Sequence, residues 1–422
     1  LLKRMPCIHY TKRLRRAEEY ARTLSSGYDC VVANPPYMGS GKMNPWLSEW
    51  VKGHYPEEKG DLCTCFVRRG VDACVPGGYT SLITASSWMF ISSFERMREN
   101  IAERAAITSL IQQSTHGFPS VTVPTCMFTL VQTTEDIEGC YIRLEDFDRP
   151  RLQQPKALEA IRNPSCGWCY YARLSSFKSI PGMPYAYYIA PELRNAFAVA
   201  KPLSEIARPR KGLGTGNKDL FMRGWWEVPW DNLCLNASDR DEARASGARW
   251  FPHNKGGSFR KWYGNNDYVV DWAEDGAAIK SYRNGRGQLA ARPQNQDCYF
   301  KECVTWSKVS TGQLAFRYKP TGTIFNEAGP AIFGDTDLML RLEAFLNSSV
   351  CGKVAEAISP TLDFQVGQVA TYPILPEVLT EDTVGTVREL TKDAKDDWDS
   401  SEVSWDFLRH PLVRGGRLED AY

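Results

Sequence analysis

The sequence predicts an α/β protein with two dissimilar halves, and three patterns carry this prediction. Over residues 1–145 short apolar runs alternate with helix-like segments, as in layered α/β folds. Residues 201–375 contain short, Gly-rich and Trp-rich segments, which favour a second, mixed α/β domain. Residues 376–422 are acidic and are predicted to form a helical tail. A length of 422 residues fits two or three domains.

The first half can be assigned element by element. Residues 1–27 read as a basic helix, because Tyr10 to Leu24 contain no Pro or Gly and Gly27 is a plausible stop. Residues 29–33 read as a buried strand, and Pro76-Gly77-Gly78 as a turn. The other elements predicted here are helices at 60–75 and 93–104 and strands at 79–84, 108–112 and 125–133.

The pattern changes after about residue 140, where scattered Pro and Tyr replace the alternation. We therefore predict a catalytic-type α/β domain at 1–145, a connector at 146–200, the mixed domain at 201–375 and the tail at 376–422. The net charge of +1 hides an uneven distribution. Residues 201–330 hold 20 Lys/Arg against 14 Asp/Glu, whereas residues 376–422 hold 6 against 12.

Several classes of protein are disfavoured by composition. No stretch approaches 18 consecutive apolar residues, so no membrane span is expected. The thirteen cysteines are scattered, and no His lies beside the pair Cys166/Cys169, which therefore reads as packed thiols rather than a metal site. A reduced, cytoplasmic setting fits this cysteine usage, and no metal is expected.

The stretch YDCVVANPPYMG at 28–39 carries the clearest chemistry, because a strand runs directly into a rigid corner. An amino nitrogen conjugated to a ring is a poor nucleophile. Two acceptors, Asn34 Oδ1 and the Pro35 carbonyl, would each take one of its N–H groups and direct its lone pair at a methyl donor. Pro36 helps to fix the backbone, and Tyr37 offers a flat face for an extruded base. The alternative is an ordinary loop with two prolines.

This corner resembles motif IV of the amino-group DNA methyltransferases that make N6-methyladenine. Protein glutamine methyltransferases also carry such a corner, but they lack a long additional domain. Further segments follow the order of the DNA-modifying family: Asp61-Leu62 with Phe66, Pro76-Gly77-Gly78 before the strand at 79–84, and Phe118-Pro119 with Val123 before the strand at 125–130. The resemblance implies a catalytic site at Asn34, Pro35, Pro36 and Tyr37.

Two stretches of the second half resemble a target-recognition domain. Lys211-Gly-Leu-Gly-Thr-Gly-Asn217 does not complete a phosphate-loop pattern, but it resembles the start of that domain in large single-chain adenine methyltransferases. The predicted DNA-contacting residues are basic or polar and lie in this stretch and in the loop 255–265: Arg208, Arg210, Lys211, Thr215, Asn217, Lys255, Arg260 and Lys261. The alternative for the loop 255–265 is a solvated Gly loop with Trp and Tyr in the core.

Segments 304–308 and 398–407 extend the resemblance over nearly the whole chain, to phage-defence (BREX) adenine methyltransferases of the PglX type. The resemblance implies the C-terminal half of a Rossmann-like methyltransferase sheet followed by a target-recognition domain. It also implies S-adenosylmethionine as methyl donor, double-stranded DNA as substrate, other BREX defence proteins as partners, and self-marking of host DNA as the role.

The expected cofactor loop is not evident. Only 33 residues precede Asn34, with Gly27 as their one glycine, and neither 212–216 nor 255–257 follows a convincing strand. The expectation is that cofactor-binding residues lie upstream of Leu1 and that this chain alone is inactive. Two alternatives stay open: a non-catalytic DNA-recognition module, and a methyltransferase acting on RNA or on a protein amide.

Overall fold

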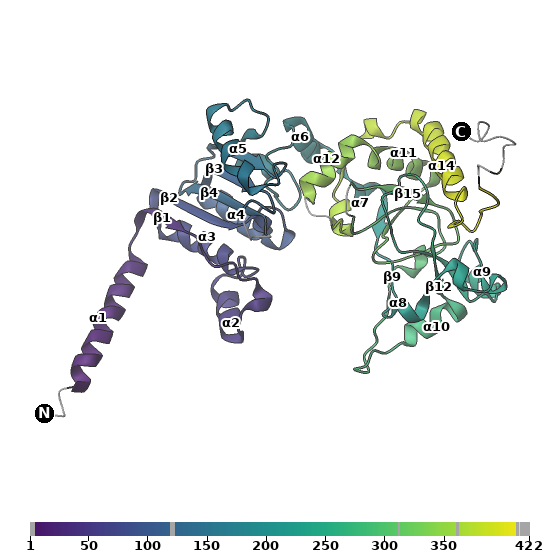
Figure 1. Cartoon of the computed structure of the whole chain (residues 1–422), viewed down its shortest axis with the longest axis horizontal. Helices are drawn as coiled ribbons and strands as arrows, with labels where there is room; N and C mark the ends of the chain where they lie inside the picture. Colours follow the sequence, from purple (N-terminus) through teal and green to yellow (C-terminus); the bar gives the residue numbers. More distant parts are fainter. Residues whose placement is uncertain (1–4, 119–122, 311–312, 360–362, 411–412, 414–422) are drawn as a thin grey trace. The chain divides into compact units, whose positions relative to one another are not determined.

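The chain forms two compact units, Leu1–Arg194 and Asn195–Tyr422, in the computed structural model (Figure 1). The structure describes residues 5–118, 123–310, 313–359, 363–410 and 413, with the backbone alone for residues 5–13. Pro119, which contributes to one of the motif resemblances, lies outside these residues. The α/β class predicted from the sequence is confirmed, because both units combine helices with strands.

The first unit contains, in chain order, α1 (Met5–Ser25), β1 (Tyr28–Ala33), α2 (Pro45–His54), α3 (Leu62–Ala73), β2 (Cys74–Ala85), α4 (Glu95–Arg104), β3 (Ala106–Gln113), β4 (Thr125–Val131), β5 (Glu138–Leu144), α5 (Pro150–Arg162) and β6 (Cys169–Arg173). The helix α6 (Pro191–Val199) crosses the boundary between the units. The predicted helices and strands of this half are thereby confirmed, with ends that differ by a few residues.

Six strands form one mixed sheet in the order β1-β2-β4-β3-β5-β6. The pairs β1–β2 and β3–β5 are parallel, and the other three pairs are antiparallel. Residues 29–33 form a strand as predicted, but the prediction that this strand is buried is wrong. Because β1 is an edge strand, one side of its ladder has no partner among the described residues, and the Val32 side chain is 74% exposed.

The predicted turn at Pro76-Gly77-Gly78 is a bulge inside β2. The register with β1 passes from Tyr28↔Cys74 to Cys30↔Tyr79, so β2 carries three extra residues there. Gly77 has φ +80°, and a Cβ on Gly78 would lie 2.9 Å from the Tyr28 carbonyl oxygen. The glycines therefore allow the strand to bulge without leaving the sheet.

Helix α3 packs on β2, and Gly70 allows the close approach, since a Cβ there would lie 2.5 Å from the Thr80 methyl carbon. The core of the unit centres on Trp88, which is fully buried and makes edge contacts with Phe128 and Tyr185. Aromatic side chains of this size bury much apolar surface, so this cluster is the main source of stability in the unit.

The structure differs from the expectation of a connector at 146–200. Residues Cys169–Arg173 pair with β5 as the last strand of the sheet, and Tyr185 and Tyr187 are buried in the same core as Trp88. The scattered Pro and Tyr residues that look irregular in sequence are therefore the packed end of the first unit. Cys166 and Cys169 lie partly buried in a small apolar cluster, as expected for packed thiols.

The second unit contains β7 (Lys201–Pro202), α7 (Leu203–Ile206), β8 (Arg208–Arg210), β9 (Leu213–Gly214), α8 (Lys218–Phe221), β10 (Met222–Gly224), α9 (Arg240–Ala245), β11 (Trp250–Asn254), β12 (Tyr268–Asp271), α10 (Ala273–Ser281), β13 (Arg292–Pro293), β14 (Cys303–Trp306), β15 (Phe316–Lys319), β16 (Ile324–Phe325), β17 (Ala331–Phe333), α11 (Thr336–Leu346), α12 (Ser349–Ile358), α13 (Val366–Val369), β18 (Pro373–Ile374) and α14 (Asp382–Asp399).

Two four-stranded sheets, β10-β12-β11-β16 and β15-β14-β17-β8, form the framework of this unit. The two-stranded pairs β9–β13 and β7–β18 complete it. The acidic segment is part of the same unit, because α14 packs against α11 and buries Val387 and Trp398. It therefore contributes to the folding of the second unit rather than extending from it.

Candidate active site and nucleic-acid interface

The predicted corner begins where β1 ends, beside the parallel strand β2. Ala33 is the last paired residue of β1, opposite Leu82, and Asn34 follows it with an exposed side chain. Pro35 is buried beneath it. The Asn34 side chain makes no hydrogen bond to any residue that the structure describes, so its amide oxygen is available to accept one from a ligand.

Asp61 holds the backbone that follows the corner. Its Oδ1 accepts hydrogen bonds from Met38 N at 3.1 Å and from Cys63 N at 3.0 Å, the second of which caps α3. Leu62 N donates to the Met38 carbonyl at 3.0 Å. The segment 34–38 is thus fixed at both ends, to β2 through β1 and to α3 through Asp61. This contact explains why an Asp occurs at 61, in the motif order noted above.

Tyr37 is the aromatic group of the corner, and its side chain is 38% exposed. Partial burial raises the pKa of Tyr37 to about 12, and the nearby Cys63, Cys126 and Asp61 add to the shift. The phenol therefore stays neutral at any physiological pH. A neutral, half-exposed ring next to a free acceptor suits stacking against a planar heterocycle.

The stretch 211–217 packs against its own unit. The expectation that Thr215 contacts DNA is not supported, because this side chain is only 8% exposed. Asn217 is likewise engaged within the protein: its Oδ1 caps α8 through Leu220 N at 3.1 Å, and its Nδ2 donates to the Tyr282 hydroxyl at 3.0 Å. Thr215 is thus buried, and both polar groups of the Asn217 side chain are used within the unit.

The cations before this stretch have different surroundings. Arg208 is exposed on β8, whereas Arg210 is half-buried and donates to the neighbouring Pro209 carbonyl at 3.0 Å. Lys211 forms an ion pair with Glu327 at 3.3 Å, at the surface. An exposed pair of this kind contributes little to stability, so Lys211 can exchange its partner for a phosphate at low cost.

The loop 255–265 is held against β15 by a buried lysine. Lys319 Nζ donates to the carbonyls of Gly264 at 2.8 Å and Asn265 at 3.2 Å. Lys261, predicted to contact DNA, instead donates to the Asn347 carbonyl at 2.7 Å. The structure therefore places the Lys261 ammonium against its own unit, which satisfies it there.

Two cations of this loop lie closer to the surface. Arg260 forms an ion pair with Asp397 of α14 at 2.9 Å and lies over the Trp398 ring. Lys255 lies over the Tyr268 ring at 4.3 Å from its centroid. From the sequence, the acidic tail and this basic loop were predicted to lie in separate domains. In the structure, they contact each other in one unit through Arg260 and Asp397.

Neither glycine-rich stretch fits a cofactor cradle. A Cβ on Gly212 would lie 2.1 Å from the Phe325 carbonyl oxygen, and one on Gly216 would lie 2.7 Å from the Ala290 carbonyl carbon. Gly256 and Gly257 lie equally close to Ala328 and Asn265. The space beside these glycines is occupied by the protein's own chain. We therefore assign no described residue to S-adenosylmethionine.

Within the described part of the chain, no three His, Cys, Asp or Glu side chains are grouped so as to hold a metal ion. A search of the same residues finds no helix long and apolar enough to cross a membrane.

A basic hairpin at residues 282–292 was missed by the sequence reasoning. Residues 276–296 contain Lys280, Arg283, Arg286 and Arg292 but no Asp or Glu, and this charge run was the available signal. The two ends of the hairpin meet through Ala290 N, which donates to the Tyr282 carbonyl at 3.1 Å.

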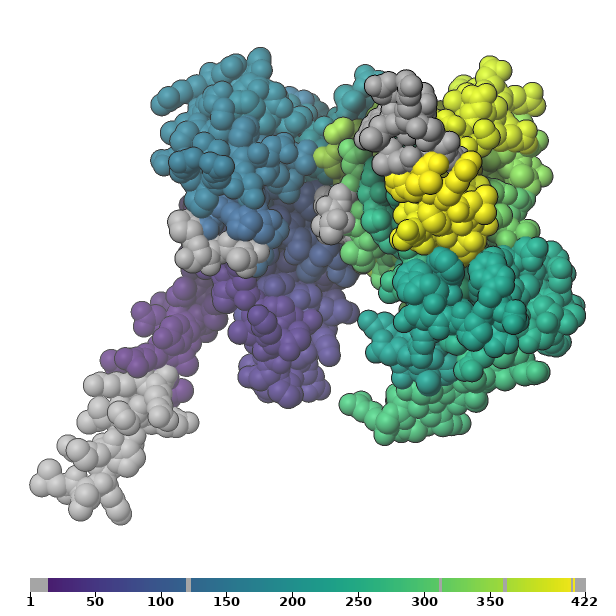
Figure 2. Space-filling model, turned by 45° about the vertical axis from the view of Figure 1, so that its right-hand side comes forward, coloured from purple at the N-terminus to yellow at the C-terminus, as the bar shows by residue number. Residues whose placement is uncertain are grey.

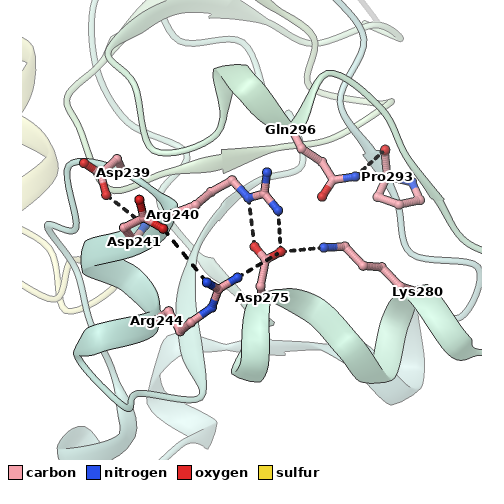
Figure 3. Close-up of polar contacts among 8 residues, drawn as sticks. All are labelled: Asp239, Arg240, Asp241, Arg244, Asp275, Lys280, Pro293 and Gln296. Carbon is pink, nitrogen blue, oxygen red and sulfur yellow. Dashed lines mark hydrogen bonds and ion pairs between the residues drawn. The ribbon is translucent and has the colours of Figure 1, made fainter.

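The helix that leads into this hairpin is held by one carboxylate (Figure 3). Asp275 Oδ1 accepts from Arg240 Nε at 2.8 Å, and Asp275 Oδ2 accepts from Lys280 Nζ at 2.7 Å. Arg244 lies 3.7 Å away. Three cations around one mostly buried carboxylate therefore fasten α9 to α10, and Arg244 also lies 4.0 Å from Asp241.

This cluster predicts a stability change in acid. Burial by itself raises the pKa of Asp275, but the hydrogen bonds from Arg240 and Lys280 outweigh it and hold the pKa at about 2, below the ordinary 3.8. The stabilisation is therefore complete above about pH 4 and is lost as the pH falls toward 2. In urea unfolding, Asp275→Asn should narrow the difference in unfolding free energy between neutral pH and pH ~2.5. Asn is chosen because residue 275 has φ +57°.

The control for this experiment is Asp241→Asn, since Asp241 is 95% exposed and lies 4.0 Å from Arg244. It should leave the pH dependence of unfolding unchanged. Equal acid sensitivity of the wild-type protein and the Asp275→Asn variant would contradict the assignment.

The chain is similar to known proteins over nearly its whole length. The chain is 35% identical over 413 residues to the adenine-specific methyltransferase PglX of Lacticaseibacillus casei (strain Zhang), which covers 96% of this chain and 34% of that protein. It is 31% identical over 404 residues to the adenine-specific methyltransferase BrxX of Escherichia coli O9:H4 (strain HS), which covers 94% of this chain and 31% of that protein. The chain is similar to adenine-specific methyltransferases of the PglX type. It spans about a third of the length of these curated relatives.

The family model of the Eco57I restriction-modification methylase matches residues 7–118, a range that includes the corner. Among solved structures, the type IIL restriction-modification enzyme MmeI in complex with DNA aligns with a TM-score of 0.48 and 10% identity. This alignment covers 93% of this chain and 52% of that one. A DrdV–DNA complex aligns with a TM-score of 0.48 and 12% identity, covering 90% and 45%.

Proposed function

We propose that this chain carries the base-binding corner and the target-recognition domain of a DNA adenine-N6 methyltransferase that uses S-adenosylmethionine. The observation that carries the proposal is the free, exposed Asn34 amide at the end of β1, beside the half-exposed Tyr37 ring and fixed through Asp61. Similarity to PglX and BrxX over nearly the whole chain supports it. The test is the level of N6-methyladenine in genomic DNA when Asn34 is replaced by alanine.

In this proposal the chain acts by positioning. Asn34 Oδ1 and the Pro35 carbonyl accept the two amino hydrogens of an adenine that has been extruded from the duplex. These two hydrogen bonds direct the lone pair of the nitrogen out of the ring plane, and Pro35 and Pro36 restrict the backbone that carries the acceptors. Tyr37 stacks on the base. We assign the methyl donor no contact among the described residues.

The substrate is proposed to be double-stranded DNA, contacted by exposed cations of the second unit. Arg208, Lys255 and Arg260 remain candidates for phosphate contacts, because none of them is buried. Arg210 and Lys211, both partly exposed, follow Arg208 at the end of β8 and are further candidates. Self-marking in a BREX phage-defence system in the cytoplasm, with other BREX proteins as partners, is the proposed setting. It rests on the similarity to PglX and BrxX.

Neutralising the loop cations should reduce the salt dependence of DNA binding. Lys255→Gln with Arg260→Gln should lower the magnitude of the slope of log K against log salt by up to about 2, because each lost phosphate contact removes about 0.9. Adding Lys261→Gln should change the slope little, since Lys261 is bonded to Asn347. The measurement is fluorescence anisotropy with a mixed-sequence duplex at several salt concentrations.

The matched control removes two exposed cations elsewhere in the second unit, by Lys353→Gln with Arg388→Gln. Their side chains are 67% and 62% exposed. If both double variants change the slope equally, the loop 255–265 has no particular role in binding.

A further inference from the structure

The hairpin 282–292 is a basic, exposed segment of the second unit that the proposed site does not use, with three Arg and no Asp or Glu. Arg283, Arg286 and Arg292 are exposed, and so is the tip from Gly285 to Leu289. In Figure 1 the segment is the green loop that extends beyond α8 and α10, and Figure 2 shows it as a narrow projection from the same unit. Leu289, at the end of this tip, is 60% exposed.

The tip has a defined shape. Asn284 Oδ1 accepts hydrogen bonds from Arg286 N at 2.9 Å and Gln288 N at 3.1 Å, and Gly287 N donates to the Asn284 carbonyl at 2.8 Å. Arg283 Nη1 donates to the Gly287 carbonyl at 2.7 Å. Asx-type bonds of this kind fix a turn without help from neighbouring elements. The Arg286 side chain is therefore presented from an ordered turn between two glycines.

The base of the hairpin is attached to the stretch 213–217. Arg292 pairs with Gly214 in the ladder β9–β13, and Asn217 Nδ2 donates to the Tyr282 hydroxyl at 3.0 Å. Gly216 has φ +73°, and any side chain there would collide with the backbone at Ala290. The stretch 213–217, which was predicted from the sequence to contact DNA, thus supports the base of the hairpin. This gives a physical reason for Gly216 and Asn217.

Helix α10 supports the base of the hairpin on the N-terminal side. Lys280, in the last turn of this helix, donates to Asp275 in its first turn, and Arg240 and Arg244 of α9 contact the same carboxylate (Figure 3). Because Arg244 also lies 4.0 Å from Asp241, this cluster is balanced by carboxylates, and the unbalanced positive charge lies along the hairpin itself. A rigid, narrow, positively charged ribbon is complementary to a groove of a nucleic-acid duplex, whose walls are phosphates.

We propose that the hairpin 282–292 enters a groove of the target DNA, with Arg286 at the base edges and Arg292 near the phosphates. Arg286 is the residue at the tip, and the glycines on either side leave its guanidinium unshielded, as contact with base edges requires. Arg283 is held within the hairpin and stiffens it. This inference rests on the proposed function, since it takes DNA as the substrate.

The first test is binding of the purified protein to a mixed-sequence DNA duplex over a range of salt concentrations. Arg286→Ala combined with Arg292→Ala should weaken binding at least about tenfold near 0.1 M salt and lower the magnitude of the salt slope by about 1 to 2. Arg388→Ala, which removes an exposed cation from α14, should leave binding near the wild-type value. Wild-type affinity in the hairpin variant would overturn the proposal.

A second variant tests whether DNA binding depends on the position of the hairpin or only on its positive charge. Tyr282→Phe keeps every cation but removes the hydroxyl that Asn217 holds. It should weaken binding about two- to fivefold with an unchanged salt slope, because the same phosphates are neutralised by a looser element. No effect of Tyr282→Phe on binding would mean that the contact between Asn217 and Tyr282 has no role in DNA binding.

The third measurement is the map of N6-methyladenine in cells that carry Arg286→Ala. Fewer methylated sites, or sites with a relaxed sequence, support the groove contact. An unchanged map together with unchanged binding refutes the hairpin proposal and leaves the proposed function intact. If the wild-type protein binds no duplex DNA and its cells contain no N6-methyladenine, the proposed function itself is refuted, independently of the hairpin variants. Preference for RNA in the binding assay would refute the DNA assignment.

Discussion

Asn34→Ala should reduce N6-methyladenine in genomic DNA at least about 100-fold when it replaces the wild-type gene. The reasoning is that Asn34 Oδ1 is one of two acceptors for the amino group, and loss of one preorganised group of this kind costs about 10²- to 10³-fold in rate. The Asn34 side chain is exposed and has no partner among the described residues, so its loss should not destabilise the fold. The measurement is mass spectrometry of digested genomic DNA.

Two further variants make this experiment specific. Asn34→Asp keeps an acceptor oxygen at the same position and should retain more methylation than Asn34→Ala, which a purely structural role would not predict. Asn163→Ala changes an exposed asparagine that follows α5 in the same unit and should leave methylation unchanged. Normal levels of N6-methyladenine in Asn34→Ala cells would refute the catalytic assignment.

Arg98→Met should destabilise the first unit by about 3 kcal/mol or more. Arg98 is fully buried on α4, and its guanidinium donates to the carbonyls of Trp88 at 2.6 Å, Ile91 at 2.9 Å and Gly182 at 3.2 Å. Burial lowers the pKa of Arg98 to about 10, so the group stays charged. Met fills a similar volume but removes this donor from the carbonyls of Trp88 and Gly182, whereas the Ile91 carbonyl still accepts from Phe94 N at 3.0 Å.

The matched control is Arg96→Met on the same helix. The Arg96 side chain is 78% exposed and pairs with Glu99 at 3.2 Å, so its loss should cost less than about 1 kcal/mol. Urea unfolding followed by tryptophan fluorescence compares the two, since Trp88 lies in the affected core. Similar unfolding midpoints for both variants would show that the carbonyls of Trp88 and Gly182 find other donors.

The elements of the first unit were predictable because their signals are local. Apolar strands, the absence of Pro and Gly in helices and the sequence Asn-Pro-Pro-Tyr depend on near neighbours, and β2, β3, β4, α3 and α4 follow them closely. The exposure of Val32 was not predictable, because burial of a strand depends on what covers it. The strand β6 was missed for a related reason: pairing with β5 is set by the sheet and not by the composition of residues 169–173.

In the candidate interface, too, some features could be predicted from the sequence and others could not. The sequence identifies which residues are charged, aromatic or glycine, and the unbroken basic run at 276–296 is visible in it. It does not show that Lys261 is turned toward the Asn347 carbonyl, that Arg260 meets Asp397, or that Asn217 supports Tyr282. These contacts join residues 65 to 137 positions apart, and nothing in the local pattern encodes them.

The sequence alone therefore determined which groups form the corner, because Asn34, the two prolines and Tyr37 are contiguous and the proline rings restrict their backbone. Only the tertiary structure decided which basic residues face solvent and which are satisfied internally. The physical reason is that a cation's role depends on the nearest acceptor. For a side chain as long as Lys or Arg, that acceptor is chosen by the fold rather than by the neighbouring sequence.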